Sequence, residues 1–536
     1  MRTGLTGIMA CMQTEPETSR QANLQIARSA GTVMAAFVIS KLIGLLATSL
    51  TARVFGTSPE SNSFFAANRF SEILFNLVAG GALGSAFIPV FTGLLVADDH
   101  KKAWKLAASI INLVTVVLIA VSILSMIFSR QVVHYLLAPG FAPREEILTA
   151  QLLRIQVISS VIFGISGLVM GILNSHHRFF LPALAPAMYQ IGWILGIYFL
   201  TPVMGVFGLA WGVVLGSALH LLVQVPQLLR LPNQKYEVTL GLDLPEVREV
   251  ARLMVPRLLG VAIVQLNFLI NTYLASFQPP GSITAISLAF TLMIMPESAI
   301  AQSIAIAALP TFSKQVALNK LDEMRSSLSA TLRVVLMLAV PASIGMILLR
   351  RPIVSLLYEG RQFDAHSTDL VAWALLWYCL GLVGHSVVEI ISRAFYALHD
   401  TKTPVTVGVG AMSLNLMLSF AFVALFNRLG WMPHGGLALA NTVATFIEAI
   451  LLLILMRRRL QGIDENRIVG STIKFLFAGL AMGVLIWQMN AILPRMHVAL
   501  SLGLRILCGM AVYLLVIFLL RSEEITSLFR IFRKRS

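Results

Sequence analysis

The chain has 536 residues, of which 57% are hydrophobic and 12% are charged, and its net charge is +15. Soluble domains carry about twice that share of charged residues, so the composition excludes a protein built only from soluble domains. Apolar stretches of membrane-spanning length recur from residue 30 to residue 520, which predicts an all-α polytopic membrane protein. No basic, aromatic-rich segment stands outside these stretches, so nucleic acid is not expected as a partner.

The sequence lacks the motifs of common enzymes and cofactor sites. Its three cysteines, Cys11, Cys379 and Cys508, do not have the spacing of a zinc site or of a disulfide framework. No glycine-rich stretch is followed by Lys-Ser or Lys-Thr, and no catalytic serine elbow or zinc motif occurs. We therefore expect no enzyme, no bound metal and no cofactor.

Taken in order, the chain begins with a polar segment, residues 1–29, which we predict to be a cytoplasmic tail. Fourteen apolar spans follow, each long enough to cross a membrane as a helix. Their approximate centres are Gly44, Ala79, Val116, Phe163, Trp193, Val214, Val264, Met295, Leu338, Gly381, Ser413, Thr445, Ala481 and Ala511.

The distribution of lysine and arginine between the loops predicts the orientation. Cytoplasmic loops of membrane proteins carry an excess of these residues. The richer set of loops includes the residues Lys101, Lys102, Lys105, Arg178, Arg230, Lys235, Arg248, Lys314, Lys320, Arg325, Lys402, Arg457, Arg458, Arg459 and Arg467. This set and the basic tail 521–536 are therefore expected inside, which places both termini in the cytoplasm. The loop that holds Arg350, Arg351 and Arg361 fits this orientation least well.

Four short motifs recur in the same order at offsets of 216 to 228 positions, which indicates an internal repeat. The pairs are Lys41–Gly44 with Arg257–Gly260, Ala86–Phe91 with Ala307–Phe312, Pro182 with Pro404, and Gly208–Ala210 with Gly436–Ala438. The offset spans an even number of helices, so both copies enter the membrane in the same direction. We predict two parallel six-helix bundles, residues 30–228 and 229–460, and two further helices in residues 461–520. Such transporters hold the substrate between the bundles and alternate access by rocking them.

A short polar segment, Arg393–Pro404, lies between two long apolar runs of the second bundle. Proline cannot donate a backbone hydrogen bond and disfavours helix at the residue before it, so one helix is expected to end here and the next to begin. Any loop between membrane helices can have this composition. The related segment that ends at Pro182 favours a specific role, and we predict that Asp400, Lys402 and Pro404 form a hinge.

Ionisable residues within apolar spans are costly in lipid, so they are candidates for function. They are Lys41, Arg53, Arg69 and Glu72 in the first bundle and Arg257, Glu297, Glu389 and Arg393 in the second. Lys41 and Arg257 occupy equivalent repeat positions, and two facing cations would suit a diphosphate. The alternative is that the cations form ion pairs within the membrane, for example Arg257 with Glu297.

Several motifs resemble those of one transporter family, the MurJ/MviN lipid II flippases. They are Ser40–Gly44, Asn62–Ala67, Ala86–Val90, Gln265–Thr272, Ala307–Ser313, Glu359–Asp364 and Arg393–Pro404. The resemblance covers about residues 30 to 460. It implies the multidrug/oligosaccharidyl-lipid/polysaccharide exporter fold, with fourteen spans and two lobes, and a groove for the lipid tail in the last two helices.

The same resemblance implies a function in cell-wall biogenesis and cell shape. The chain is expected to move lipid-linked peptidoglycan precursor across the bacterial inner membrane by alternating access, driven by membrane potential or an ion gradient. The implied substrate is an undecaprenyl-diphosphate-linked saccharide, and the implied partners are the lipid bilayer and cell-wall synthesis proteins.

The chain departs from the family in the charged residues of the cavity. The family has arginine where this chain has Ala47 and Thr291, and an acidic residue where it has Asn62, whereas Lys41 matches a basic family position. The predicted substrate-binding residues are therefore Lys41, Arg69, Arg257, Asn62 and Thr291.

Three other functions stay open because of these departures. The chain could export another polyprenyl-diphosphate-linked saccharide. It could export small cations, with Glu297 and Glu389 as the candidates for ion coupling. It could also be a non-transporting scaffold in a cell-wall complex.

Overall fold

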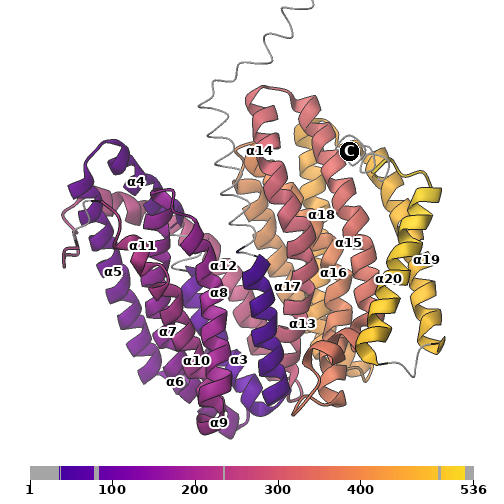
Figure 1. Ribbon diagram of the computed structural model, residues 1–536, viewed down its shortest axis with the longest axis horizontal. Helices are drawn as coiled ribbons and strands as arrows, with labels where there is room; N and C mark the ends of the chain where they lie inside the picture. The colour runs from indigo at the N-terminus through magenta and orange to yellow at the C-terminus, as the bar shows by residue number, and fades with distance from the viewer. Residues whose placement is uncertain (1–35, 37, 78–83, 233–235, 493–496, 525–536) are drawn as a thin grey trace, which may run out of the picture. The chain divides into compact units, whose positions relative to one another are not determined.

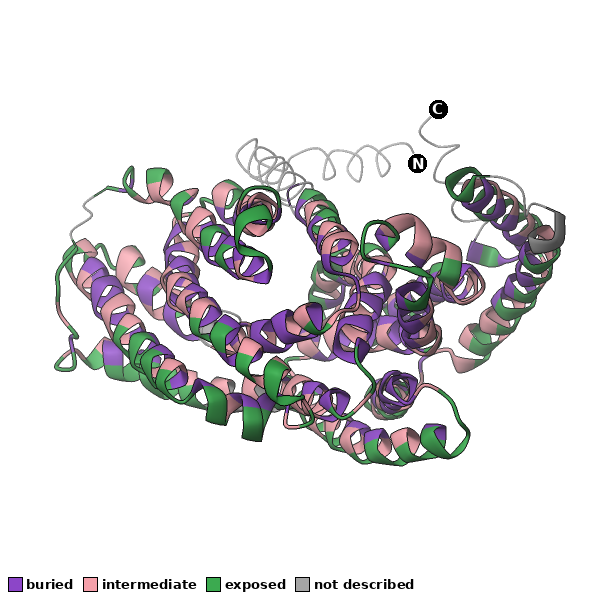
Figure 2. Cartoon of the chain, turned by 90° about the horizontal axis from the view of Figure 1, so that it is seen from below, coloured by how far each residue is buried: buried purple, intermediate pink, exposed green. Residues whose placement is uncertain are grey.

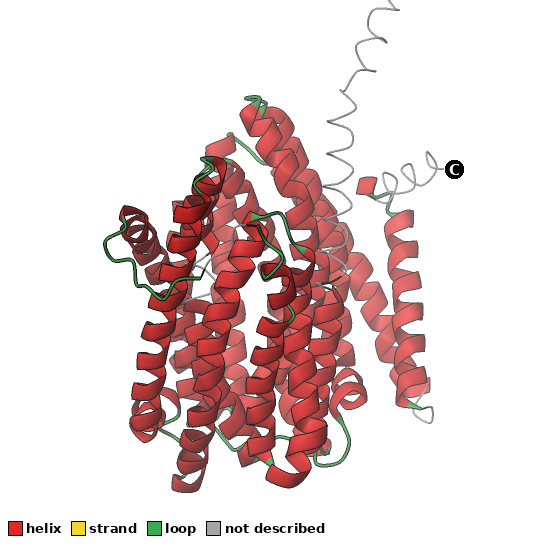
Figure 3. Cartoon of the chain, turned by 60° about the vertical axis from the view of Figure 1, so that its left-hand side comes forward, coloured by secondary structure: helices red, strands yellow, loops and turns green. Residues whose placement is uncertain are grey.

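The computed structural model describes residues 36, 38–77, 84–232, 236–492 and 497–524, and these residues are almost entirely helical (Figure 3). Within these ranges the only β-type pairing is one isolated bridge between Gly360 and Phe363. Twelve of the described helices are long and apolar enough to cross a membrane, and they contain twelve of the predicted span centres. The prediction of an all-α polytopic protein is confirmed.

The two other predicted span centres lie outside these twelve helices. The centre Val264 lies in α12 (Pro245–Ser276). The centre Ala79 lies outside the described residues, between α3 (Pro59–Phe75) and α4 (Gly84–Val96). The predicted tail 1–29 and most of the basic tail 521–536 also lie outside them.

The remaining helices follow in chain order after the helix Val38–Phe55. They are α5 (His100–Ile127), α6 (Ser129–Gln131), η2 (Val132–Leu137), α7 (Pro143–Ser175), α8 (Phe180–Leu195), η3 (Gly196–Leu200), α9 (Thr201–Met204), α10 (Val206–Leu222), α11 (Val225–Leu228), α13 (Ser282–Glu297), η4 (Ser298–Gln302), α14 (Ser303–Ala317), α15 (Leu321–Tyr358), α16 (Ala365–Ala397), α17 (Lys402–Arg428), α18 (His434–Leu460), α19 (Glu465–Ile492) and α20 (Val498–Leu519).

The first of two compact units comprises Met1–Ala47, Ser71–Ile127 and Leu153–Leu259. Within it α8 and α10 run side by side (Figure 1). A Cβ added to Gly192 of α8 would lie 2.2 Å from the Cα of Gly216 in α10. Small residues thus let the two backbones touch, as is common where membrane helices pack by dispersion forces.

The second unit comprises Thr48–Phe70, Phe128–Leu152 and Gly260–Ser536. Within it α16 packs against both α15 and α18, and α19 packs against α15. Gly479 and Gly483 of α19 lie against α15. A Cβ on Gly479 would lie 2.5 Å from the Cδ1 of Ile344 in α15. Figure 2 shows that the helices carry their buried residues along one side and their exposed residues along the other, as expected for helices that face lipid.

The helix boundaries repeat along the chain, in agreement with the predicted repeat. The starts of α7 and α16 are 222 positions apart, and so are their ends. The starts of α8 and α17 are also 222 positions apart. The starts of α10 and α18 are 228 positions apart, because the loop before α18 is longer. The two halves of the chain therefore contain the same series of helices.

The helix ends repeat in atomic detail as well. His177 and His399 both have positive φ, at 56° and 59°. In each case the next N–H donates to the carbonyl five residues earlier, from Arg178 to Leu173 at 2.9 Å and from Asp400 to Phe395 at 3.0 Å. This left-handed closure satisfies carbonyls at a helix end that would otherwise lack a partner.

Candidate functional site

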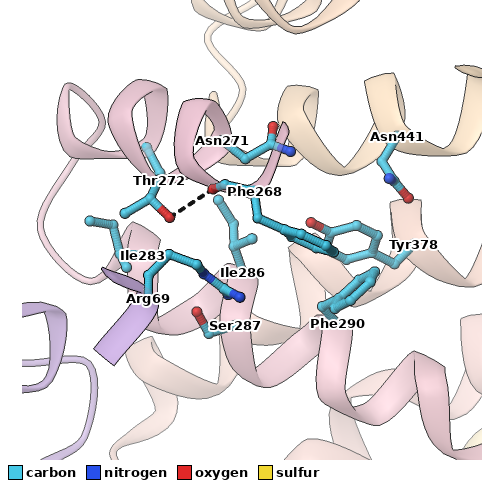
Figure 4. A pocket seen from close by; sticks show the side chains of 11 residues that line it. Arg69, Phe268, Asn271, Thr272, Ile283, Ile286, Ser287, Phe290, Tyr378 and Asn441 are labelled. Carbon is cyan, nitrogen blue, oxygen red and sulfur yellow. Dashed lines mark hydrogen bonds between the residues drawn. The ribbon is translucent and has the colours of Figure 1, made fainter. Parts of the chain in front are cut away.

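A pocket in the second unit contains one of the predicted substrate-binding cations. Its lining residues come from α3, α12, α13, α16 and α18, and Figure 4 shows them in place. They are Arg69, Phe268, Asn271, Thr272, Ala275, Ile283, Ile286, Ser287, Phe290, Tyr378 and Asn441. The lining thus combines one cation with aromatic rings, amides and hydroxyls.

Arg69 is half-buried and points into this pocket (Figure 4). Its guanidinium carbon lies 5.2 Å from the centre of the Phe268 ring, within the range of a cation–π interaction. This contact holds the planar guanidinium in the pocket lining. A guanidinium held in this way can donate two parallel hydrogen bonds to a phosphate or a carboxylate.

Three aromatic rings form one wall of the pocket. The centres of Phe268 and Phe290 are 5.9 Å apart, and those of Phe290 and Tyr378 are 5.3 Å apart, both in edge-to-face geometry. Such pairs are rigid and add to the free energy of burial. The wall therefore offers a preformed apolar surface beside the cation.

Polar groups on the other walls are positioned by hydrogen bonds. The Thr272 hydroxyl donates to the carbonyl of Phe268 at 3.0 Å, and the Asn271 amide donates to Asn267 Oδ1 at 3.1 Å. Asn441 of α18 approaches His385 of α16 at 3.1 Å. The pocket thus pairs an apolar wall with several oriented polar groups, which is the usual composition of a ligand site.

Asn62 and Thr291 lie near this pocket but not in its lining. Asn62 is 3% exposed, and its side-chain oxygen accepts hydrogen bonds from the N–H and the hydroxyl of Thr284, at 3.1 and 2.9 Å. Thr291 follows Ser287 by one helical turn and donates to its carbonyl at 2.8 Å. Asn62 therefore joins α3 to α13 in the structure, and the roles predicted for both residues stay predictions.

Positions 62 and 284 are 222 apart, so Asn62 and Thr284 are repeat equivalents that contact each other. Ser61 also contacts the Thr284 hydroxyl, at 3.1 Å. Arg69 and Thr291 are likewise repeat equivalents on α3 and α13. The repeat thus brings α3 and α13 together, but only α3 carries a cation at that position.

The two other predicted cations belong to the first unit. Lys41 is exposed on the helix Val38–Phe55. Arg257 lies in the helical backbone of α12, but its side chain lies outside the described residues. The predicted facing of Lys41 and Arg257 is therefore untested.

The two acidic candidates have different surroundings. Glu389 forms an ion pair with Arg393 one helical turn later on α16, with an N–O distance of 2.7 Å. Glu297 is the last residue of α13, and the π-helical turn η4 follows it. A π-turn inside a helix often marks a functional position, which suits the role predicted for Glu297. The predicted role of both residues in ion coupling stays a prediction.

The predicted hinge is the junction between α16 and α17, and side-chain hydrogen bonds stabilise it. The Asp400 carboxylate accepts hydrogen bonds from the N–H and the hydroxyl of Thr403, at 3.0 and 2.7 Å. The Thr403 N–H holds the pKa of Asp400 below its ordinary value of 3.8. Lys402 is the exposed first residue of α17, and Pro404 is buried in its first turn. The structure thus shows how α17 begins, and movement at this junction stays a prediction.

Most of the aromatic lining was not identified from the sequence. Phe268, Phe290 and Tyr378 are single aromatic residues in apolar spans, where aromatic residues are common. The spacing of Ile283, Ile286, Ser287 and Phe290 along α13 was a usable signal, because it defines one helix face with a hydroxyl in it.

Comparisons with known proteins agree on one family. Residues 51–525 match the sequence model described as lipid II flippase MurJ. A lipid II flippase MurJ from Burkholderia cenocepacia is 30% identical over 443 residues, which cover 81% of this chain and 84% of that protein. A probable lipid II flippase MurJ from Rhizobium tropici is 27% identical and covers 92% of this chain and 94% of its own length.

Solved structures give the same result. The structure of lipid II flippase MurJ in an inward closed conformation matches with a TM-score of 0.79 at 25% identity, over 91% of this chain and 98% of that one. An inward-facing multidrug transporter of the MATE family matches with a TM-score of 0.65 at 17% identity, over 81% of this chain and 99% of that one, which shows a shared fold.

Proposed function

The chain belongs to the MurJ family of lipid II flippases, and from this we propose that it moves lipid II across the bacterial inner membrane by alternating access. The observation that carries the proposal is the pocket around Arg69. The family is one of transporters, so the chain acts by moving its substrate.

The pocket suits the head of a lipid-linked saccharide. In this proposal the Arg69 guanidinium donates to a phosphate oxygen of the diphosphate. The ring wall of Phe268, Phe290 and Tyr378 packs against the apolar faces of the sugars. The amides of Asn271 and Asn441 hydrogen-bond to sugar hydroxyls, so the three kinds of lining residue each meet one part of the head group.

Lys41 and Arg257 supply further positive charge in this proposal. Each lies in a membrane-spanning segment at a repeat-equivalent position, where an unneutralised cation is costly. A diphosphate carries enough negative charge to be bound by several cations at once. Neutral variants of Lys41 and Arg257 are therefore expected to lose transport while the folded protein is retained.

Alternating access requires α3 and α13 to separate at one end. The contact between Asn62 and Thr284 joins repeat-equivalent positions, so it is the contact that a rocking motion of the two repeats would break. We place both termini in the cytoplasm on the basis of the loop charges. Reporter fusions at each terminus test that orientation.

Complementation tests the proposed function. We would express the chain in a bacterium depleted of its own lipid II flippase, then measure growth and the lipid II exposed on the outer leaflet. The wild type is expected to restore both, and Arg69→Ala is expected to lose about ten- to hundredfold of the rate, because a hydrogen bond to a charged group contributes about 1.5 to 3 kcal/mol. Arg458→Ala is a matched control, since Arg458 is exposed in the last turn of α18.

Failure of the wild type, when it is shown to be inserted and abundant, would contradict the proposal. Full activity of Arg69→Ala would remove the pocket from the substrate path. The amount of each variant in the membrane is measured in the same cells.

A second candidate is the export of a different polyprenyl-diphosphate-linked saccharide. One observation favours it, since position 291 beside the pocket holds threonine rather than the arginine expected from the family resemblance. Rescue of a mutant in polysaccharide export, without rescue of the lipid II flippase mutant, would support this candidate.

A further inference from the structure

Glu448 is a carboxylic residue in the middle of a membrane-spanning helix. It is the fifteenth residue of α18, which has 27 residues, so it lies roughly 20 Å along a helix about 40 Å long. The residue is half-buried. Carboxylates at this depth are rare and are usually functional.

The Glu448 carboxylate has no hydrogen-bond donor and no ion-pair partner among the residues that the structure describes. On α16, which packs against α18, Arg393 is paired with Glu389 at 2.7 Å. A carboxylate that is partly removed from water and not neutralised by a neighbour favours the uptake of a cation.

The packing leaves room for the carboxylate on one side. A Cβ added to Gly408 of α17 would lie 3.3 Å from Glu448 Oε1, so the absence of a side chain there makes space for the carboxylate. Tyr396 of α16 lies within electrostatic range of Glu448, and the Arg393 guanidinium carbon lies 5.8 Å from the centre of the Tyr396 ring.

Polar side chains lie along one face of α18 between the pocket and Glu448. Asn441 lines the pocket and is visible in Figure 4. Asn441 and Thr445 of α18 both contact His385 Nε2 of α16, at 3.1 and 3.4 Å. Thr445 precedes Glu448 by three residues, so Asn441, Thr445 and Glu448 share one face of α18.

The repeat shows what is unusual about Glu448. The equivalent position in the first half of the chain is His220, also the fifteenth residue of its helix, α10. His220 Nδ1 contacts the Ser166 hydroxyl at 2.7 Å, and Gln224 donates to the same hydroxyl at 2.8 Å. The first half thus satisfies its titratable group internally, whereas the second half leaves its carboxylate open.

We propose that Glu448 binds the cation whose gradient drives transport. This inference rests on the proposed function. A proton and a sodium ion would both neutralise this carboxylate. Uptake of either cation removes the free-energy cost of a charge in the middle of α18. Because Glu448 shares one face of α18 with Asn441, which lines the pocket, we infer that the charge state of this carboxylate acts on occupancy of the pocket along that face.

A spectroscopic experiment tests the site without reference to transport. The full chain in lipid vesicles is titrated from about pH 9 to about pH 5 in potassium chloride, and infrared difference spectra record the band of a protonated carboxylic acid in an apolar environment. The wild type and the control Glu323→Gln, which changes an exposed carboxylate, are expected to gain this band. Glu448→Gln is expected to lack it.

Repeating the titration in sodium chloride distinguishes the two cations. If sodium binds, the band appears only at lower pH than in potassium chloride. If only a proton binds, the two titrations coincide. A band of unchanged size in Glu448→Gln would overturn the proposal in both salts.

A transport assay tests the coupling. Lipid II movement is measured in the same vesicles with a gradient of pH or sodium and no membrane potential. The gradient-driven rate of Glu448→Gln is expected to fall about tenfold, a coupling of ordinary size, while Glu323→Gln keeps the wild-type rate. Full gradient-driven transport by Glu448→Gln would overturn the coupling.

The two proposals fail in different ways. A wild type that shows the band but moves no lipid II would contradict the proposed function and leave the cation site standing. A wild type that moves lipid II but lacks the band would contradict the cation site alone. The amide of glutamine costs less than a carboxylate in an apolar environment, so Glu448→Gln is expected to fold.

Discussion

The two halves of the chain contain the same series of helices but place their polar groups differently. At one repeat position, the first half has His220 in a closed network with Ser166 and Gln224, and the second half has Glu448 without a partner among the described residues. At another, the first half has Gln156 and the second has Tyr378, which lines the pocket. The shared fold therefore does not require a shared function, and the open polar groups of the second half are the ones suited to binding.

The largest expected effect comes from joining the equivalent positions of the two repeats. In the double variant Asn62→Cys and Thr284→Cys, oxidation is expected to form a disulfide, because the two side chains are already in hydrogen-bond contact. If α3 and α13 must separate there, transport stops on oxidation and returns on reduction. Each single variant, treated in the same way, is the control, and unchanged transport by the cross-linked protein would show that this contact stays closed throughout.

A smaller effect is expected from opening the closed network of the first half. Ser166→Ala removes the hydroxyl that meets both His220 and Gln224. Leaving buried groups without a partner costs about 1 to 3 kcal/mol, so thermal stability in detergent should fall. Transport per folded molecule should not change, because none of these three residues is part of the lining of the pocket around Arg69. A selective loss of transport would mean that the first half also takes part in binding or coupling.

A proline inside α15 distinguishes the halves in a third way. Pro341 has no N–H to donate to the carbonyl of Met337, and the Tyr513 hydroxyl of α20 donates to that carbonyl instead, at 2.6 Å. The repeat equivalent of Pro341 in α5 is Ala120, so the first half needs no such partner. The last two helices thus complete a hydrogen bond that the proline removes.

Tyr513→Phe tests the importance of this bond. The variant is expected to lose about 1 kcal/mol, the usual contribution of one hydrogen bond, and α20 should become more accessible to proteases. The double variant Tyr513→Phe with Pro341→Ala is the matched control, because alanine restores the backbone donor. Equal losses in both variants would show that the hydroxyl acts by another route.

The smallest effect concerns the start of α17. Asp400 accepts from the Thr403 N–H, and its pKa is lowered as a result. Its stabilisation is therefore complete above the ordinary pKa of 3.8 and is lost as the pH falls through the lowered value. The equivalent residue in the first half is Arg178, which cannot accept a hydrogen bond.

Hydrogen exchange measures this difference. In Asp400→Ala, the first turn of α17 is expected to exchange faster at neutral pH, by about 0.5 kcal/mol, the lower end of what loss of a capping side chain costs. The first turn of α8 should be unchanged. If α17 and α8 respond alike to acid, Asp400 does not determine the difference between the two helix starts.

Much of the fold follows from the sequence. Apolar runs of membrane-spanning length allow few structures other than helices, because lipid offers no partner for backbone N–H and C=O groups. The repeat was visible in the positions of Pro182 and Pro404, since proline restricts the backbone wherever it occurs. Family motifs then indicated the kind of transporter, and the comparisons agree with it.

The candidate site was only partly predictable. Arg69 stood out because a charge within an apolar span is costly. Phe268, Phe290 and Tyr378 did not, because an aromatic ring in such a span carries no signal of its own. Asn62 was assigned to the substrate, and the structure places its side chain in a contact with Thr284.

The sequence by itself determined the class of the protein, the repeat and the costly charges, since each depends on composition and order along the chain. Only the tertiary structure decided which charges have partners. Arg333 is paired at 2.7 Å with Glu524, which lies 191 positions later in the chain, whereas Glu448 faces Gly408 on another helix. The physical reason is that neutralisation of a buried charge depends on contacts a few ångströms long between helices that lie far apart in the sequence.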